Sequence, residues 1–403
     1  MQINQIVKKI GILHSSSTET PTSFDLARLL VDHIECDWNN PLLKFLDPAC
    51  GRGTFLLALM SKLEEYGHDR THIITNMLYG VDSSRVQSMI ACKSLRLARN
   101  TPSNIFCDNS LTRKFNMQFD VIIGNPPYQG NNDKGTKQPK SHNLWSKFVD
   151  RSMELIKDDG FVGFVTPDSW MSPNSQVLKT FKDNSLIWVD TEVGKYFTVG
   201  SSFTAWIMQK NKNTQSVSID GLAVAINKLQ YLPRNFAKTY PIHDKVINST
   251  DPKLGILCDT SCHSDHKHKN FSDTKDAIYK YTTFHTNAQT KFCKKQSKDF
   301  SKSKIIWTTS GYFKPFFSVG DLGTSEVCQY ILVDSANAQN ILSYLDSKLY
   351  KFIVNTGKWS GFLNGKVLSL LPKLTNKNWT DQEIYKHFKL TQEEIDYVEA
   401  NVK

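Results

Sequence analysis

The sequence predicts an α/β protein whose N-terminal half folds as a doubly wound domain, with helices on both faces of a parallel sheet. Short strands that are apolar along their whole length alternate with amphipathic helices up to residue 210, which is typical of buried parallel strands. The alternation stops at residues 211–218, which are polar and unpatterned. We therefore place a boundary there and expect domains at residues 1–212 and 213–403.

The first domain opens on a predicted helix at residues 22–34, whose leucine and isoleucine side chains recur at helical spacing on one face. Thr22 or Ser23 is expected to cap its N-terminus. The elements that follow are expected in this order: a strand at 44–49, a helix at 54–66, a strand at 77–82, a helix at 84–100, strands at 104–108 and 119–124, a helix at 143–157, and strands at 161–167, 185–192 and 202–210.

The second domain is predicted to be mixed α+β, with an irregular and loop-rich pattern. One helix is expected over residues 340–353, where apolar side chains form a single stripe. Two closing helices should each begin with a capping box, in which a threonine precedes a glutamate by three residues. These boxes are Thr380 with Glu383, and Thr391 with Glu394.

The composition, with 22% charged and 39% apolar residues in 403, is that of an ordinary globular protein. No run approaches the roughly 20 apolar residues that a membrane span needs, and the first residues lack the apolar core of a signal peptide. The eight cysteines are scattered through the chain, as reduced cytosolic thiols are. We therefore expect a cytoplasmic protein with no membrane partner.

The net charge of +10 is concentrated in the second half of the chain. Residues 1–210 hold 23 Lys and Arg against 21 Asp and Glu, whereas residues 211–374 alone carry a charge of +10. Six lysines, among them Lys294 and Lys295, lie in residues 291–304 and are flanked by aromatic side chains. This pattern suits binding to the phosphate backbone of a nucleic acid, although a solvated lysine-rich surface would look the same.

The stretch LDPACGRGTF (residues 46–55) joins the first predicted strand to a helix. Gly51 and Gly53 permit a tight turn and a close approach of the backbone to a ligand, and the following helix directs its first N–H groups into the same space. The third glycine of a dinucleotide-binding loop and the GK[ST] of a P-loop are both absent. Asp47, at the end of the strand, would instead attract a cationic group such as an ammonium.

Two further aspartates end the next two predicted strands. Asp82 is placed to accept hydrogen bonds from ribose hydroxyls, and Asp108 could accept one from an adenine amino group. Each aspartate alone could equally be a helix cap or a solvated loop charge. Three acidic residues that end three successive strands, beside one glycine turn, favour a pocket for a nucleoside that also carries an ammonium.

The stretch GNPPYQ (residues 124–129) directly follows the strand at 119–124. An exocyclic amine of a base becomes nucleophilic when its lone pair leaves conjugation with the ring, and two acceptors around the nitrogen favour that change. The Asn125 side-chain oxygen and the Pro126 carbonyl can supply them, because the prolines keep the turn rigid. Tyr128 then offers a ring face to a flat base. The alternative is a Pro-Pro turn that only ends the strand.

These motifs resemble those of the S-adenosylmethionine-dependent amino-methyltransferases: DPACGRGTF, GVD, the strand that ends at Asp108, and FDVIIGNPPY. Residues 143–170 and 195–210 resemble the later motifs of that family, and TPTSFDLARLL (residues 20–30) its motif that closes the methionine pocket. The order resembles the gamma arrangement of DNA adenine-N6 methyltransferases of restriction–modification systems. The similarity is clearest over residues 17–210, and residues 340–374 more weakly resemble target-recognition domains.

The resemblance implies a Rossmann-like, seven-stranded methyltransferase domain at residues 1–212 and a basic target-recognition domain at 213–403. It implies S-adenosylmethionine as cofactor, no metal, and methyl transfer to adenine N6 in double-stranded DNA by base flipping. The implied cofactor-binding residues are Thr20, Pro21, Asp47, Ala49, Gly51, Gly53, Asp82, Asp108 and Asn125. The implied catalytic residues are Asn125, Pro126, Pro127 and Tyr128, and the substrate-binding residues are Tyr128, Phe197, Lys294 and Lys295.

Individual roles also follow from the resemblance. Thr20 and Pro21 would flank the methionine moiety, with Asp47 on its ammonium, Asp82 on the ribose and Asp108 on the cofactor adenine. Asn125, Pro126 and Tyr128 would hold the target adenine. Phe197 would pack on the other face of that base, although Phe203 could take its place.

Other functions stay open at this point. An RNA adenine-N6 methyltransferase would share every catalytic residue, whereas protein glutamine N5-methyltransferases use NPPY but lack a large basic C-terminal domain. A catalytically inactive DNA-binding protein would not need every motif residue to be intact. A separately encoded restriction endonuclease is a candidate partner, because the sequence shows no nuclease core of its own.

A run of cysteine and histidine residues, Cys258, Cys262, His263, His266 and His268, raises the question of a metal. No C-x-x-C pair is present there, and the spacing fits no common structural zinc site. We expect a solvated or DNA-facing loop instead.

Overall fold

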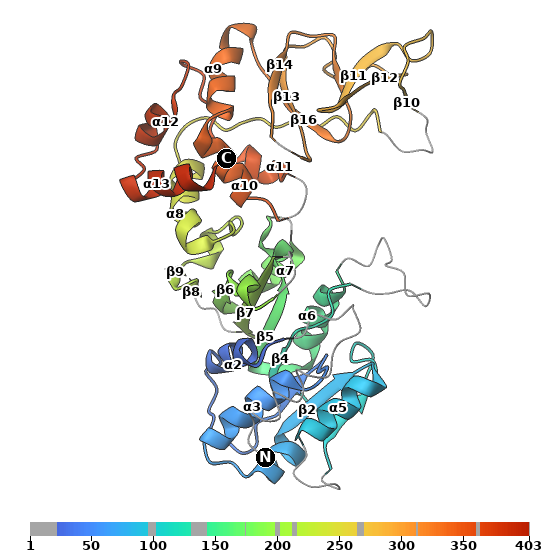
Figure 1. The fold of residues 1–403 in the computed structure, drawn as a ribbon, viewed down its shortest axis with the longest axis vertical. Coiled ribbons are helices and arrows are strands. Elements are labelled where there is room, and N and C mark those ends of the chain that lie inside the picture. The colour runs from blue at the N-terminus through green and yellow to red at the C-terminus, as the bar shows by residue number, and fades with distance from the viewer. Residues whose placement is uncertain are drawn as a thin grey trace. The chain divides into compact units, whose positions relative to one another are not determined.

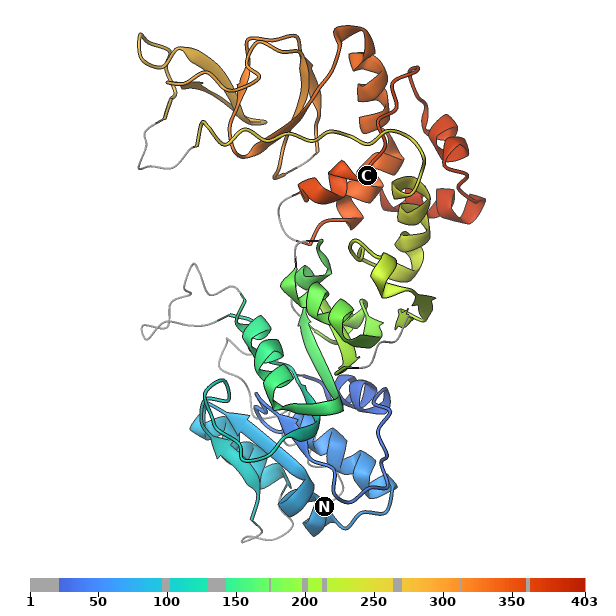
Figure 2. The same ribbon diagram turned by 180° about the vertical axis from the view of Figure 1, so that it is seen from behind.

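The structure of the protein is a computed structural model. It describes residues 22–95, 102–129, 143–173, 175–197, 202–211, 216–263, 270–311, 313–359 and 363–402. These residues form two compact units (Figures 1 and 2). The first lies within Met1–Trp170 and Asn174–Gln230, and the second within Met171–Pro173 and Tyr231–Lys403.

A nine-stranded sheet forms the centre of the first unit, in the order β3-β2-β1-β4-β5-β7-β6-β8-β9. Its strands are β1 (Phe45–Asp47), β2 (Leu78–Asp82), β3 (Asn104–Cys107), β4 (Phe119–Gly124), β5 (Ile156–Pro167), β6 (Ser185–Asp190), β7 (Phe203–Gln209), β8 (Val217–Ile219) and β9 (Leu222–Val224). Every strand predicted up to residue 210 is present. The predicted Rossmann-like arrangement is therefore confirmed, with β8 and β9 extending the sheet past residue 212.

The sheet is mixed rather than wholly parallel, and in this respect the prediction was wrong. From β3 to β5 the neighbouring strands pair in parallel, whereas β7 runs antiparallel to both β5 and β6. All seven residues of β7 are buried. Because a strand buried on both faces is apolar whichever way it runs, the sequence pattern could not reveal this inversion.

Helices cover both faces of the sheet. The helical segments of the first unit are α2 (Phe24–Asp32), α3 (Thr54–Glu65), α4 (Arg70–His72), the π-helical turn η1 (Ile73–Met77), α5 (Arg85–Leu95), α6 (Leu144–Leu155), α7 (Gln176–Asp183) and the 3-10 turns η2 (Asp168–Met171), η3 (Val193–Tyr196) and η4 (Ile226–Lys228). Ser23, not Thr22, caps α2, because its side chain accepts a hydrogen bond from the Leu26 amide.

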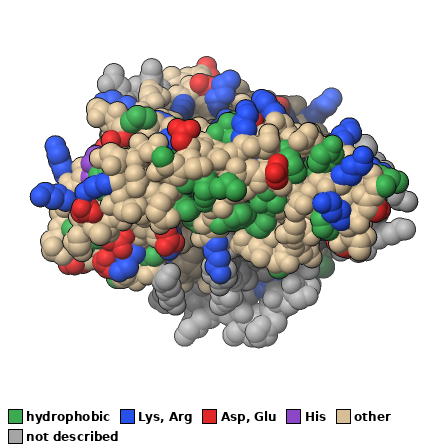
Figure 3. All heavy atoms as spheres, turned by 90° about the horizontal axis from the view of Figure 1, so that it is seen from above, with side chains coloured by type: hydrophobic (Ala, Val, Ile, Leu, Met, Phe, Trp, Pro, Cys, Tyr) green, Lys and Arg blue, Asp and Glu red, His purple; other side chains and the backbone are tan. Residues whose placement is uncertain are grey.

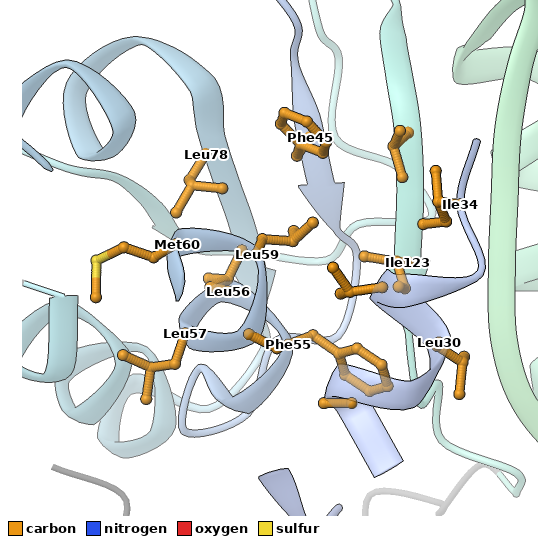
Figure 4. Close-up of a cluster of buried hydrophobic side chains, with 14 of the residues drawn as sticks. Leu30, Ile34, Phe45, Phe55, Leu56, Leu57, Leu59, Met60, Leu78 and Ile123 are labelled. Carbon is orange, nitrogen blue, oxygen red and sulfur yellow. The ribbon is translucent and has the colours of Figure 1, made fainter. Parts of the chain in front are cut away.

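One hydrophobic cluster anchors the strands that carry the candidate site. Helices α2, α3 and α5 share it with one face of the sheet (Figure 4). Val121 and Ile123 of β4 belong to this cluster, whereas Ile122 between them is buried and faces the other way, as strand alternation requires. On that other face the Phe181 ring of α7 contacts the Trp206 ring of β7, with centroids 4.6 Å apart. The sheet is thus fixed by apolar side chains from both sides.

The second unit is mixed α+β, as predicted. Its two sheets have the orders β10-β12-β11-β15 and β14-β13-β16. The strands are β10 (Phe271–Ser272), β11 (Tyr281–Thr286), β12 (Gln289–Cys293), β13 (Lys304–Thr308), β14 (Phe316–Ser318), β15 (Gly323–Thr324) and β16 (Cys328–Leu332). The helices are α8 (Phe236–Ile247), α9 (Ser335–Leu345), α10 (Lys348–Thr356), α11 (Gly365–Ser369), α12 (Asp381–His387) and α13 (Gln392–Asn401).

The helix predicted over residues 340–353 is two helices, α9 and α10. The break lies at Ser347, whose side chain accepts a hydrogen bond from the Tyr350 amide and thereby starts α10. A serine at this point offers the backbone a helix cap that competes with a continuous helix. The two capping boxes are confirmed, with Thr380 at the start of α12 and Thr391 at the start of α13.

The expectation of reduced thiols was wrong for one pair of cysteines. A disulfide joins Cys262 to Cys293 at the end of β12. The two residues are 31 positions apart, so their spacing in the sequence gave no indication of the pairing. Among the described helices, none combines the length and the apolar content needed to cross a membrane.

Candidate active site

Four predicted site residues lie where adjacent strands of the first unit end. Asp82 and Asp47 are the last residues of β2 and β1, while Asp108 directly follows β3 and Asn125 directly follows β4. These strands are neighbours in the order β3-β2-β1-β4 and run parallel. Their carboxyl ends therefore meet at one edge of the sheet, where doubly wound folds bind their ligands.

The Asp82 carboxylate ties the glycine turn to the end of β2. Its Oδ2 accepts a hydrogen bond from the Gly51 amide at 2.9 Å, and its Oδ1 accepts one from the Ser84 amide at 2.7 Å. Gly51 has φ +49°, and a Cβ there would meet no atom within 4 Å. Burial raises the pKa of Asp82 although both amides favour its charged form. The turn is thus held rigidly, with open space on the glycine side for a ligand.

The Asp47 carboxyl is buried between the two loops of the site, with 1% of its surface exposed. Its Oδ1 accepts a hydrogen bond from the Ala49 amide at 3.0 Å. A Cβ on Gly124 would lie 2.6 Å from the same oxygen, so only glycine fits before Asn125. Burial, together with the nearby charge of Asp82, raises the pKa of Asp47 to about 8, although the hydrogen bond from the Ala49 amide lowers it. A ligand cation at this point would restore the ionised form.

Asp108 differs from the other two aspartates because it is exposed. Its carboxylate accepts hydrogen bonds from the Asn109 amide at 2.7 Å and from Arg113 at 2.9 Å. These two bonds hold its pKa below the usual value. The Arg113 guanidinium also lies over the Phe106 ring, 3.6 Å from its centroid. A carboxylate has about four acceptor sites, so Asp108 can still accept a further hydrogen bond.

The Asn125 side chain is held from two sides. Its Nδ2 donates to Thr22 Oγ1 at 3.0 Å, and its Oδ1 accepts from the Tyr128 hydroxyl at 2.6 Å. Pro126 is buried and Pro127 exposed. The two candidate acceptors for an amine, the Asn125 oxygen and the Pro126 carbonyl, thus belong to adjacent residues of a turn that the prolines stiffen.

The aromatic residues beside Asn125 form a contact chain. The Tyr128 and Phe203 ring centroids are 5.1 Å apart, and those of Phe197 and Phe203 are 4.8 Å apart. Phe203 is 4% exposed, whereas Tyr128 and Phe197 are half-buried. Phe203 thus supports both rings from inside β7, and the choice of Phe197 as the ring that packs on the target base stays a prediction.

The lysine run at residues 291–304 is less available to a ligand than its sequence suggested. Lys291 pairs with Asp273 at 3.0 Å and Lys302 with Asp299 at 2.8 Å. Lys304 is 1% exposed, and its ammonium donates to backbone carbonyls, among them those of residues 300 and 302 at 3.2 Å. Lys294, Lys295 and Lys298 are exposed. On the face seen in Figure 3, basic side chains are interspersed with acidic ones rather than gathered into one patch.

The described residues contain no cluster of three or more His, Cys, Asp or Glu side chains arranged to hold a metal ion. Cys262 is bound in the disulfide, and His266 and His268 lie outside the described residues, as do Thr20 and Pro21 of the predicted methionine pocket. The absence of a metal from the reaction stays a prediction.

Sequence reasoning missed two partners in the site. Thr22, considered only as a helix cap, binds Asn125 across 103 positions, and no spacing in the sequence indicates such a pair. Arg113, the partner of Asp108, lies only five positions away. A basic residue so close to a strand-terminal aspartate was a signal that could have been used.

Three strand-terminal aspartates, the glycine turn and the Asn125 amide oxygen thus lie at one edge of the sheet. Residues 76–196 match the family described as Eco57I restriction-modification methylase. The type II restriction enzyme and methyltransferase RM.BcgI from Heyndrickxia coagulans is 31% identical over 134 residues, which are 31% of this chain and 20% of that protein. The enzyme RM.Eco57I from Escherichia coli, described in the same words, is 22% identical over 244 residues, 42% of this chain and 24% of that protein.

The chain thus covers about a fifth to a quarter of the length of these two relatives. A solved structure with a similar fold is a nuclease-deletion mutant of the Type ISP restriction-modification enzyme LlaGI in complex with a DNA substrate mimic. The TM-score is 0.56 at 12% identity, over 88% of this chain and 45% of that chain. The predicted resemblance to methyltransferases of restriction–modification systems is confirmed.

The burial of Asp47 predicts how its replacement changes stability with pH. Because the folded protein holds the Asp47 proton up to about pH 8, whereas an unfolded chain releases it near pH 4, this group stabilises the fold at low pH. That contribution is lost as the pH rises through the folded pKa. Asp47→Asn, which stays neutral, should therefore raise the thermal unfolding midpoint more at pH 8 than at pH 5.

Thermal unfolding of both proteins across this pH range measures the difference directly. Asp183→Asn, at an exposed position at the end of α7, is the control and should show no such trend. A gain for Asp47→Asn that is equal at both pH values would contradict the raised pKa.

Proposed function

We propose that the chain transfers the methyl group of S-adenosylmethionine to adenine N6 in double-stranded DNA. The observation that carries the proposal is the adjacency of two loops at one sheet edge. The Asp47 carboxyl of the glycine turn and the residue before Asn125 approach so closely that a Cβ on Gly124 would lie 2.6 Å from Asp47 Oδ1. A cofactor site and an acceptor for the target amine therefore lie next to each other, as direct group transfer requires.

The residues of the glycine turn fit S-adenosylmethionine. Asp47 suits the ammonium of its methionine part, because a buried carboxyl gains most from a nearby cation. Asp82 suits its ribose hydroxyls, since the carboxylate already faces the turn and keeps acceptor sites free. Asp108 suits the amino group of its adenine. When bound, this cofactor supplies a methyl group on a sulfonium, and the broken S–C bond leaves its electron pair on sulfur.

The turn at Asn125 acts on the target amine. The Asn125 oxygen and the Pro126 carbonyl accept the two N–H bonds, which draws the nitrogen lone pair out of the base and toward the methyl carbon. The nitrogen forms the new N–C bond, carries a positive charge, and then loses one proton to solvent. The adenine must first leave the DNA stack, at a cost of a few kcal/mol, and Tyr128 with Phe197 suits a flipped base.

The second unit is the candidate for DNA recognition, because it carries a charge of +7, most of the net charge of +10. Lys294 and Lys295 are exposed on a loop that follows β12, which supports their proposed contact with phosphates. A separately encoded endonuclease acting on the same site is the expected further partner, and the cytoplasm the expected location. The second compact unit consists of Met171–Pro173 and Tyr231–Lys403, whereas composition places the start of the recognition domain at residue 213; the division of roles between the two domains stays a prediction.

Asp82→Ala should weaken S-adenosylmethionine binding by about 10- to 100-fold, since a charged hydrogen-bond partner is worth about 1.5–3 kcal/mol. Isothermal titration calorimetry measures this loss, and thermal unfolding shows that the variant is folded. Asp183→Ala, at an exposed position away from the sheet edge that carries the site, is the control and should bind as the parent does. If Asp82→Ala bound the cofactor with the affinity of the parent, the assignment of Asp82 to the ribose hydroxyls would be contradicted.

Asn125→Ala should lower kcat by about two to three orders of magnitude, because its oxygen acts mainly as the nitrogen becomes tetrahedral. Binding of cofactor and DNA should change little. Transfer of labelled methyl groups to duplex DNA gives the rate, with RNA and a glutamine peptide as competing acceptors. The control Asn39→Ala, at an exposed position, should be fully active. A parental rate in Asn125→Ala, or methylation of RNA or peptide in preference to DNA, is incompatible with the proposal.

Replacing both Lys294 and Lys295 by alanine should weaken DNA binding and flatten its salt dependence. Each lost phosphate contact lowers the slope of log K against log salt by about 0.9, so a decrease of about 1 to 2 is expected. Fluorescence anisotropy at several salt concentrations measures it. The matched control is Lys366→Ala with Lys386→Ala, two exposed lysines of α11 and α12. An unchanged slope in the variant without Lys294 and Lys295 would show that these two lysines do not contact DNA phosphates.

A further inference from the structure

The Asn125 carboxamide is bound at both of its ends, which matters because the two ends are chemically different. Its Nδ2 donates to Thr22 Oγ1 at 3.0 Å, and its Oδ1 accepts from the Tyr128 hydroxyl at 2.6 Å. A phenol hydroxyl is a stronger donor than an aliphatic one, so it belongs on the oxygen. The Thr22 hydroxyl is then the acceptor for the amide nitrogen.

This inference rests on the proposed function. In the proposed reaction, an Asn125 carboxamide turned by half a rotation would be inactive. The target amine carries N–H bonds and needs an acceptor, so it must meet Oδ1. If the carboxamide turned by half a rotation, Nδ2 would face the amine, and two donors would oppose each other. One fixed hydrogen bond to Nδ2 is sufficient to exclude that orientation.

The two bonds differ in what happens when a base arrives. The Tyr128 hydroxyl donates to the same oxygen that the target amine must reach, so the amine either uses the second lone pair of that oxygen or displaces the Tyr128 bond. The Tyr128 ring still offers its face to the base when the hydroxyl is displaced. The bond to Thr22 lies at the other end of the carboxamide, and nothing in the reaction requires it to break.

The position of Thr22 is fixed by the helix that follows it. It immediately precedes Ser23, which caps α2 by accepting from the Leu26 amide at 3.2 Å. Leu26 and Leu30 of that helix are fully buried in the cluster shared with the sheet. The backbone at Thr22 is therefore held by the packing of α2, so a hydrogen bond to its hydroxyl transfers this rigidity to Asn125.

We propose that Thr22 is a positioning residue that keeps the Asn125 oxygen directed at the target amine, through a hydrogen bond to Asn125 Nδ2. The Tyr128 hydroxyl supports the same orientation from the oxygen end, where the amine must also donate. Thr22 thus links the N-terminal helix to the chemical step without touching the substrate.

Two variants test the proposal in the whole 403-residue chain. Thr22→Val keeps the shape but removes the oxygen and should lower kcat by about 5- to 20-fold, with KM for DNA and affinity for S-adenosylmethionine within about twofold of the parent. Thr22→Ser keeps the hydroxyl and should restore kcat.

A parental kcat in Thr22→Val overturns the positioning role, as does a loss in Thr22→Ser as large as that in Thr22→Val. Loss of cofactor binding in Thr22→Val also overturns it, because the residue would then serve the cofactor pocket instead. These results differ from a failure of the proposed function, in which the parental protein itself would not methylate DNA and both proposals would fall. Thermal unfolding of each variant shows that the fold is retained.

Discussion

The candidate site depends on the close approach of Asp47 and Gly124. No side chain fits between the buried carboxyl at the end of β1 and the backbone at the end of β4, where a Cβ would lie 2.6 Å from Asp47 Oδ1. The parallel pairing of the two strands sets this approach. The loop that follows Asp47 and the loop that carries Asn125 are therefore neighbours. Direct transfer between two bound molecules needs such a constraint, because small misplacements are costly in rate.

The same region explains why the carboxylates differ. Asp47 is enclosed and holds its proton to about pH 8, whereas Asp108 is exposed and kept ionised by Arg113 and the Asn109 amide. Asp82 is half-buried, and its two oxygens accept hydrogen bonds from the Gly51 amide of the glycine turn and from the Ser84 amide. Three aspartates that look alike in the sequence thus have three electrostatic environments, each suited to a different part of a ligand.

Much of the fold could be predicted because, in strongly periodic segments, the spacing of apolar residues indicates which side chains are buried. The helix at α3 and the strands β2 and β4 were predicted almost to the residue. The inversion of β7 could not be predicted, because all of its residues are buried in either direction. The division between α9 and α10 was missed because the apolar stripe continues across Ser347. The Ser347 side chain caps a new helix there, and the spacing of apolar residues does not show such a cap.

For the site, residues that end strands were predictable, but their partners were not. Asp47, Asp82 and Asn125 follow from their positions after apolar strands, and the structure brings them to one edge. Thr22 could not be found in this way, because its bond to Asn125 spans 103 positions. The lysine run was overestimated for a related reason. The ion pairs of Lys291 and Lys302 and the burial of Lys304 depend on tertiary contacts that a count of charges ignores.

The most direct test of the account is nucleoside mass spectrometry of DNA from cells that express this chain and lack adenine methylation of their own. The account predicts N6-methyladenine in DNA from cells with the parental protein and almost none with Asn125→Ala produced at the same level. The RNA of the same cells should gain no N6-methyladenine. DNA free of N6-methyladenine in cells that contain the folded parental protein would contradict the account, and so would equal modification by both proteins.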